Sequence, residues 1–349
     1  MSKEPAPTPL PRRRRGGCLL RSLVLLALLA LIVFFALDYV FNLRGNIAFI
    51  TGRDPKQPLE VLLADQTWKA ATQATVAELD HALHKMGEST EGATWRRLKV
   101  RRSAQGTWQR AAQTVFESHV EVIEFPPEQF DFSVSFQDKF ALTTAQERLQ
   151  SQDLAFAITA NFRDPKGKPL GLVVHEGQQR NPPFPAWTGY FFVRNGHPWF
   201  GPKSLYEEVP GITTEVSQGY PSLLKNHTIF PYVDLAPNRY FDGDKISYRA
   251  LAGVKQTGAV VFIVSGNGGG MNVLEIATLA RQLNIQHATL LDGGRALQYS
   301  LNFGGASHDF AAFNTRFEFP WKLLAPQRSP VFIAVKARPN TASMPPAGR

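Results

Sequence analysis

Cysteine is almost absent from this chain of 349 residues, since Cys18 stands alone. A single thiol excludes an intramolecular disulfide and any metal site built from several cysteines. The sequence also contains no Gly-x-Ser-x-Gly element, so it lacks the nucleophile turn of a typical serine hydrolase. Its eight histidines show no spacing that is typical of metal ligands. The chemistry of this protein must therefore rest on other residue types.

Acidic residues are outnumbered by basic ones, and the formal net charge is +9. Residues 1–44 hold seven bases and two acids, which leaves 31 bases against 27 acids in the remainder. Half of the net charge therefore belongs to the N-terminal segment. Because the remainder carries only +4 and is expected outside the cytoplasm, we expect no nucleic-acid partner.

One long apolar run extends from residue 19 to residue 41, with Arg21 and Asp38 near its ends. A helix of this length, rising 1.5 Å per residue, crosses a hydrocarbon core of roughly 30 Å. The preceding basic cluster at residues 12–15 places the N-terminus in the cytoplasm. We therefore expect a single-pass protein of the bacterial inner membrane, with its C-terminal domain periplasmic or extracellular. A cleaved signal peptide is the alternative.

Composition divides the chain further. Pro55 and Pro58 mark a linker, and the spacing of apolar residues between Leu59 and Met86 predicts a helix. The region before residue 150 is either a small accessory layer or an elaboration of the main domain. The expected parts are a basic cytoplasmic tail (1–18), the anchor (19–41), a linker (42–58), an accessory region (59–150), the main domain (151–337) and a disordered tail (338–349).

From residue 150 onward, short apolar runs alternate with Gly/Pro turns, and few helices separate them. This pattern predicts an α+β fold with mixed or antiparallel sheets and few segregated helices. The candidate strands are residues 154–160, 170–174, 190–193, 229–233, 259–264, 288–291 and 331–335.

The segment from Ser265 to Ala296 has the clearest pattern. A glycine-rich turn is followed by a helix that Asn272 caps, with Glu275 at the reciprocal capping position. A short buried strand then ends at Asp292, where a side chain can leave the core and meet a ligand. Gly293 and Gly294 follow, and they allow a sharp turn and the close approach of a substrate.

This segment resembles the C-terminal part of the phosphodiester glycosidase family, which includes the mannose-6-phosphate uncovering enzyme and many bacterial envelope proteins. The resemblance rests on the glycine turn, the Glu275-Ile276-Ala277 triplet and the Leu291-Asp292-Gly293-Gly294 strand end. The chain departs from the family pattern at Arg295-Ala296, where Gly-Ser is expected. Weaker similarities occur in the family's order at residues 157–164, 171–177, 218–223 and 248–253, so the resemblance covers roughly residues 150 to 337.

The resemblance implies hydrolysis of the bond between a sugar's anomeric carbon and a phosphodiester oxygen. Such a reaction needs a carboxylate and a group that holds the phosphate. Asp292 is the first candidate for the carboxylate, as nucleophile, base or metal ligand, although an aspartate before Gly-Gly also forms turns. Glu275 is the second candidate, and its capping role would explain it equally well. Arg249 could clamp phosphate in a bidentate manner, or it could be an ordinary surface residue.

Further residues are candidates for substrate binding. Asn161 and Gln218 could bind sugar hydroxyls, although isolated polar residues near turns are usually structural. The turn formed by Gly268, Gly269 and Gly270 offers N–H groups at a helix N-terminus, where phosphate binds well, but a simple flexible turn fits the sequence equally. No cofactor is required by the sequence; Asp292 with a neighbouring residue could hold Mg²⁺ or Ca²⁺, and nothing in the spacing demands a metal.

We therefore expect a membrane-anchored, exported hydrolase that acts on a carbohydrate-phosphate in an envelope glycan or glycolipid. The alternative is a non-catalytic glycan-binding or scaffold protein on the same fold, which the Arg295-Ala296 departure favours. The sequence leaves the oligomeric state, the sugar and the stereochemistry of the reaction open.

Overall fold

The computed structural model describes residues 16–104, 106–230, 243–312, 317–318, 322–323 and 327–339. It divides into two compact units, Met1–Leu43 and Arg44–Arg349. The first unit contains helix α1 (Gly16–Phe41), so the expected helix in this part of the chain is confirmed. Its segment Leu20–Asp38 is long and apolar enough to cross a membrane, a property that signal sequences share. Most of the expected basic tail and the expected disordered tail lie outside the described residues.

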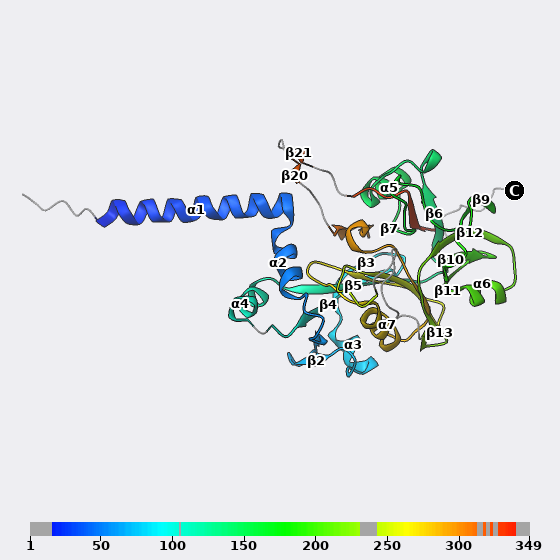
Figure 1. The fold of residues 1–349 in the computed structure, drawn as a ribbon, viewed down its shortest axis with the longest axis horizontal. Helices are drawn as coiled ribbons and strands as arrows, with labels where there is room; N and C mark the ends of the chain where they lie inside the picture. Colours follow the sequence, from blue (N-terminus) through cyan, green and yellow to red (C-terminus); the bar gives the residue numbers. More distant parts are fainter. Residues whose placement is uncertain are drawn as a thin grey trace, which may run out of the picture. The chain divides into compact units, whose positions relative to one another are not determined.

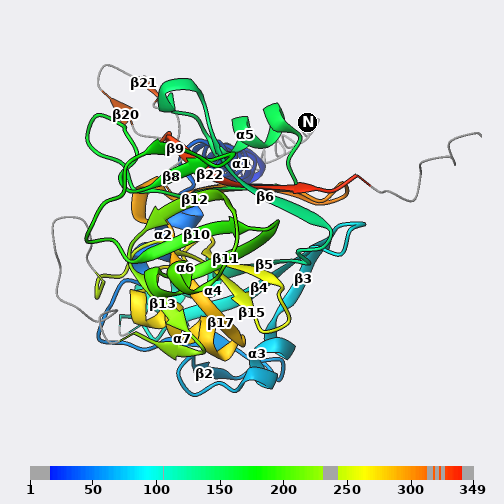
Figure 2. The ribbon, with the colours of Figure 1, turned by 90° about the vertical axis from the view of Figure 1, so that its right-hand side faces the viewer.

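The second unit is built on antiparallel sheets (Figures 1 and 2). The largest has ten strands. Their order is β14 (Thr228–Ile229), β13 (Ser222–Lys225), β17 (Ile285–Leu290), β15 (Ala250–Lys255), β16 (Val260–Ser265), β5 (Ser118–Phe125), β4 (Thr94–Arg102), β1 (Leu59–Leu62) and β2 (Trp68–Ala70), with β3 (His84–Glu88) paired to β4.

Two five-stranded sheets complete the framework. One has the order β11 (His197–Pro202), β10 (Gly189–Arg194), β12 (Thr213–Gly219), β8 (Val173–His175) and β9 (Gln178–Asn181). The other has the order β19 (Ser307–Ala311), β18 (Gln298–Asn302), β7 (Phe156–Thr159), β22 (Val331–Ala337) and β6 (Phe130–Phe136). A short pair, β20 (Phe317–Glu318) and β21 (Lys322–Leu323), stands apart.

The helices of this unit are short and do not alternate regularly with the strands. They are α2 (Leu43–Thr51), α3 (Val76–Ala82), α4 (Thr107–Val115), α5 (Ala145–Gln152), α6 (Lys203–Glu208) and α7 (Val273–Gln282), with 3₁₀ turns at Asp138–Phe140 and Gly294–Ala296. Antiparallel sheets with few helices confirm the predicted α+β class.

The central strands β15, β16 and β17 of the ten-stranded sheet are buried on both faces, which explains their largely apolar sequences. In β16, Phe262 and Val264 enter the core shared with the five-stranded sheets, where the ring centroids of Phe262 and Phe156 are 4.8 Å apart. Val261 and Ile263 point to the opposite face, which α7 and α3 cover (Figure 2). Because successive side chains of a strand point to opposite faces of the sheet, β16 contributes apolar side chains to two separate hydrophobic cores.

Helix α7 begins as predicted. The Asn272 side chain accepts from the Glu275 N–H at 2.8 Å, and Glu275 Oε2 accepts from the Asn272 N–H at 2.8 Å. The following strand, β17, ends one residue before Leu291-Asp292. These contacts confirm the predicted order of helix, strand and carboxylate.

The single helix expected over residues 59–86 is wrong, and the expected divisions of the chain before residue 150 stay predictions. Residues 59–86 hold strands β1, β2 and β3, and only α3 is helical, because their apolar residues come from several elements rather than from one helix face. The expected linker contains α2. Residues 59–150 also supply β4 and β5 to the same sheet as β15 and β16, so this region is part of the main unit.

Candidate active site

A cleft of about 650 Å³ lies where the segments after β7 and β17 meet. The backbone holds these segments together, since the Asp292 N–H donates to the Ala160 carbonyl at 3.1 Å. The residues that line the cleft are Phe162, Arg163, Asp164, Pro165, Leu170, Asp292, Gly293, Arg295, Ala296 and Gln327. The cleft therefore gathers charged side chains at the ends of strands from two different sheets.

Asp292 is the most buried charged group of this cleft, with 5% of its surface exposed. Burial raises the pKa of Asp292 to about 8, although the charge of Arg163 and the Gly293 N–H act in the opposite direction. A carboxyl group with this pKa holds its proton at neutral pH. It can therefore donate a proton, which an ordinary surface aspartate cannot do.

Gly293 and Gly294 follow Asp292 in a tight turn. A Cβ at Gly293 would lie 2.7 Å from the Tyr248 carbonyl oxygen, and Gly294 has φ +60° and donates to the same oxygen at 2.7 Å. Only glycine fits both conditions without strain. Gly293 also lines the cleft, so the turn brings backbone close to any ligand bound there.

Three charged residues of the cleft were not predicted as site residues. Arg163 and Arg295 supply two cations, and Asp164 supplies a second carboxyl group. Asp164 Oδ1 accepts from the Lys168 N–H at 2.9 Å in a turn, which leaves its other oxygen without a hydrogen-bond partner among the described residues. Their positions in the sequence could have indicated them. Arg163 and Asp164 follow Asn161 shortly after the end of a strand, and Arg295 directly follows Gly293 and Gly294.

Asn161 and Gln218 are buried and are not among the lining residues of the cleft. Gln218 accepts from the Leu172 and Phe184 N–H groups, and it donates to the Phe184 and Trp187 carbonyls and to Tyr190. Asn161 donates to the Gln218 carbonyl at 2.7 Å, and its Oδ1 accepts from Ser217 at 2.5 Å. Both amides are fully buried, so their contacts fix the loop that carries Arg163.

Glu275 is held in an ion pair at the start of α7. Its two carboxylate oxygens each lie 2.6 Å from a nitrogen of Arg102, which is 2% exposed. The same carboxylate completes the capping box. Glu275 is not among the lining residues of the cleft, and its catalytic role stays a prediction.

Arg249 lies near the cleft through its backbone only. Its Cα is 3.6 Å from the position of a Cβ on Gly293, whereas its guanidinium donates to the Lys245 carbonyl at 2.9 Å and to the Met271 carbonyl at 3.3 Å. The predicted phosphate clamp therefore points toward the start of α7.

The turn of Gly268, Gly269 and Gly270 is a packing element. Cβ atoms there would meet Ser118 Oγ at 2.3 Å, the His119 carbonyl at 2.0 Å and the Phe49 ring at 2.7 Å. These glycines are explained by the close approach of β5 and α2. Their phosphate-binding role stays a prediction as well.

A metal site was left open by the sequence. Among the described residues, no group of three or more His, Cys, Asp or Glu side chains could hold a metal ion.

Three comparisons with known proteins show what this chain is similar to. Residues 152–316 match the profile of the phosphodiester glycosidase family. Comparison with curated proteins gives no match. Among solved structures, the catalytic domain of zebrafish N-acetylglucosamine-1-phosphodiester alpha-N-acetylglucosaminidase, auto-inhibited by its pro-peptide, is similar with a TM-score of 0.54 and 14% identity. That match covers 74% of this chain and 89% of the zebrafish chain.

Two bacterial structures are similar at lower scores. A hypothetical protein from Synechocystis has a TM-score of 0.49 and 15% identity, with 71% of this chain and 63% of that chain covered. A protein of Burkholderia pseudomallei described as exported has a TM-score of 0.42 and 11% identity, with coverage of 82% and 92%. The family profile spans both walls of the cleft, from the loop after β7 to the turn after Asp292. Residues 152–316, a little under half of this chain, therefore match the phosphodiester glycosidase family.

Proposed function

We propose that this protein hydrolyses a sugar-1-phosphodiester, releasing a free sugar and a phosphomonoester. The observation that carries the proposal is the cleft itself, in which the proton-holding Asp292 lies with the cations Arg163 and Arg295. A phosphodiester is an anion, and arginine pairs with phosphoryl oxygens in a bidentate manner. The match of residues 152–316 to the phosphodiester glycosidase family supports the same reaction class.

The charged groups suggest a division of labour. Arg163 and Arg295 neutralise the phosphoryl oxygens, and Asp292 donates its proton to the phosphate oxygen that leaves the anomeric carbon. Asp164 accepts a proton from the attacking water, whose oxygen forms the new bond to that carbon. One C–O bond forms as the other breaks, and both protons are accounted for.

The test is an assay of the full chain in detergent on a panel of sugar-1-phosphodiesters, with and without Mg²⁺ or Ca²⁺. Wild type should release both sugar and phosphomonoester, and Asp292→Asn should abolish turnover, because the amide cannot supply the proton. Equal turnover by the two proteins would remove Asp292 from the mechanism. A folded wild type that binds phosphorylated glycans and turns none over would favour the glycan-binding alternative.

We further propose that α1 anchors the domain in a bacterial inner membrane, with the second unit on the outer side and an envelope glycan or glycolipid as substrate. The length and composition of α1 and the basic residues 12–15 support this orientation. A membrane-impermeant thiol reagent provides the test, since Cys18 is the only cysteine. Cys18 should react only after the cytoplasmic face is opened, and labelling of intact cells would contradict the orientation.

A further inference from the structure

Helix α4 turns its apolar side away from its own domain. Trp108, Ala111, Ala112 and Val115 recur at the i, i+3, i+4, i+7 spacing of one helix face. Trp108 is 60% exposed and Val115 is 70% exposed, and none of the nine residues of α4, all of which the structure describes, is fully buried. An amphipathic helix of a soluble domain normally buries this face.

The polar side of α4 contacts the domain instead. Gln113 Nε2 donates to the Arg102 carbonyl at 3.0 Å and to the Thr51 carbonyl at 3.2 Å. The helix is therefore held by hydrogen bonds from its polar side. Its apolar side chains remain available to contact an apolar surface outside the domain.

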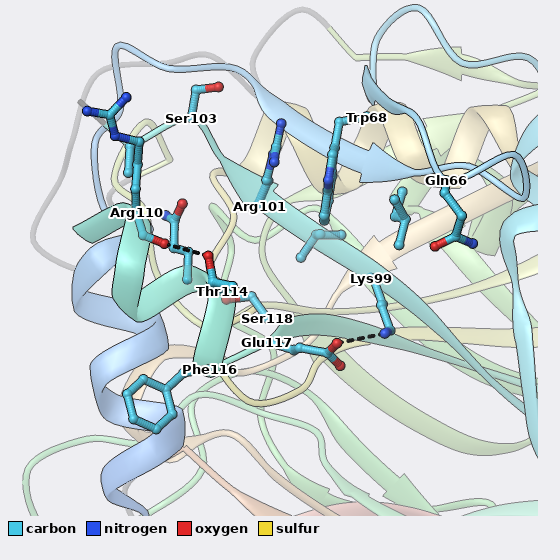
Figure 3. A pocket seen from close by; sticks show the side chains of 14 residues that line it. Gln66, Trp68, Lys99, Arg101, Ser103, Arg110, Thr114, Phe116, Glu117 and Ser118 are labelled. Atoms are coloured by element: carbon cyan, nitrogen blue, oxygen red, sulfur yellow. Dashed lines mark hydrogen bonds and ion pairs between the residues drawn. The ribbon is translucent and has the colours of Figure 1, made fainter. Parts of the chain in front are cut away.

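A cleft of about 680 Å³ with a basic lining lies beside α4 (Figure 3). Arg101 stacks 4.2 Å over the Trp68 ring and pairs with Glu60 at 2.8 Å, and Lys99 pairs with Glu117 at 2.7 Å. Figure 3 shows Arg110 on α4 reaching to the side of the cleft opposite this last pair.

Arg110 has no carboxylate partner among the described residues, whereas the other two cations are already paired. The lining of the cleft therefore includes one cation that no carboxylate neutralises. Such a site suits a phosphate group.

Chain connectivity limits how far α4 can lie from the end of α1. Helix α2 starts at Leu43, two residues after α1 ends, and the carbonyl of its last residue, Thr51, accepts the Gln113 bond. Nine helical residues span only about 13 Å. Ile50, on the same short helix, is 61% exposed. If α1 crosses a bilayer, this short stretch of chain leaves α4 within reach of the bilayer surface.

We propose that α4 and the cleft beside it bind the surface of an anionic lipid bilayer. Trp108 and Val115 enter the boundary between headgroups and acyl chains, as an interfacial helix does, and Arg110 contacts lipid phosphate. The inference rests on the proposed anchoring by α1 and is independent of the proposed hydrolysis. Its consequence is that the catalytic domain is held against the membrane by two separate attachments.

The experiment uses the full chain with Cys18→Ser, reconstituted in bilayers of phosphatidylcholine and phosphatidylglycerol. A single cysteine is introduced as Trp108→Cys or Val115→Cys and labelled with an environment-sensitive fluorophore. Ile212→Cys is the matched control, because Ile212 is also apolar and is 78% exposed. Lipids with spin labels in their acyl chains should quench the labels at 108 and 115 several-fold more than the label at 212. Equal quenching at all three positions would overturn the proposal.

Two further arms separate the alternatives. A label at 108 that is shielded from water but not quenched by lipid would show a protein occupant, such as a second copy of the chain, and would also overturn the proposal. Arg110→Gln should remove the increase in quenching that phosphatidylglycerol causes over pure phosphatidylcholine, and an unchanged increase would refute the phosphate contact.

The same samples distinguish the underlying proposals. Asp292→Asn should abolish hydrolysis and leave the quenching pattern intact. If Cys18 of the wild type shows that α1 is not inserted, the anchor and this inference fail together. If α1 is inserted and position 108 is not quenched, this inference fails alone.

Discussion

At the scale of single residues, Asp292, the proposed catalytic acid, lies in an environment that disfavours its charged form. Its ordinary pKa of 3.8 is raised to about 8 by burial, so the folded protein binds a proton that the unfolded chain releases above pH 4. Stability should therefore fall as the pH rises from about 4 to about 8. Functional sites often retain such a cost because the perturbed group performs the chemistry.

Asp292→Asn removes this cost and should make the protein more stable than wild type. The gain should be small at pH 4 and should grow to at most about 4 kcal/mol at pH 7, because each unit of pKa shift corresponds to about 1.4 kcal/mol. Urea unfolding of both proteins at several pH values measures it. Parallel stability curves for the two proteins would show that the carboxyl group of Asp292 is not desolvated.

Substitution of Arg163 or Arg295, the two cations of the cleft, should reduce activity more than substitution of an arginine outside the cleft. Arg163→Gln should lower kcat/KM by about 10- to 100-fold, since a hydrogen bond to a charged group contributes about 1.5–3 kcal/mol. Arg295→Gln should have a similar effect if Arg295, at the departure from the family pattern, also contacts the phosphate. The matched control is Arg180→Gln, an exposed residue of β9 outside the cleft lining, which should leave kcat/KM unchanged. Equal kinetics for all three variants would contradict the phosphate-binding role.

At the scale of elements, the start of α7 is joined to β4 by the pair between Glu275 and Arg102. Glu275→Gln should destabilise the protein by about 3 kcal/mol, because it leaves the buried guanidinium without a counter-charge. Asn272→Ala should cost only about 1 kcal/mol, the usual effect of losing a helix cap. Thermal unfolding measures both changes.

Activity of the same variant decides between structure and catalysis for Glu275. We expect folded Glu275→Gln protein to keep turnover close to that of wild type, since this carboxylate lies outside the cleft. Abolished turnover with an unchanged melting temperature would instead support the catalytic role that the sequence resemblance implies.

At the scale of the whole molecule, a buried charged cluster lies at the junction of two sheets. Glu121 of β5 is fully buried and accepts from Trp95 Nε1 at 2.8 Å and from Arg97 Nε at 3.0 Å. The Trp95 ring stacks on His308 of β19, with centroids 5.0 Å apart. The cluster therefore connects the ten-stranded sheet to a five-stranded one.

This cluster should make the fold sensitive to acid. Burial acts to raise the pKa of Glu121, but the hydrogen bonds and charges of His119 and Arg97 outweigh it, and the net pKa is lowered. The resulting stability is present above the ordinary pKa of 4.5 and is lost as the pH falls through the lowered value. Glu121→Gln should cost about 3 kcal/mol at pH 7 and progressively less below pH 4.5. A cost that is the same at pH 7 and pH 3 would contradict this account.

The elements that could be predicted from sequence are those whose signal is local. Helix α7 has its cap, its reciprocal Glu275 and its apolar face within a dozen residues, and β16 has an unbroken apolar run. The predicted helix over residues 59–86 failed because β1 and β2 are stabilised by pairing with each other and with β4. Strand pairing between residues far apart in the sequence produces no apolar periodicity within a short stretch of the chain.

The candidate site divides in the same way. Asp292 and the Gly-Gly corner were predicted because a carboxylate at a strand end before two glycines is visible in the sequence. Arg163 and Arg295 were not, since they lie 132 positions apart in the sequence and their loops meet only in the folded chain. The hydrogen bond from Asp292 to Ala160 and the pairing of β7 with β18 bring these loops together. Asn161 and Gln218 are fully buried and form internal hydrogen bonds, and their predicted contact with substrate stays a prediction.

The sequence by itself therefore determined the apolar N-terminal helix, the α+β class, the family resemblance and the position of Asp292 at a strand end, because these features depend mainly on residues close together in the chain. The tertiary structure decided which charges share the cleft with Asp292, that Glu275 pairs with Arg102, and that α4 presents its apolar face outward. Those features depend on which surfaces meet after the sheets pair, and burial, rather than residue type, sets the role of each polar group.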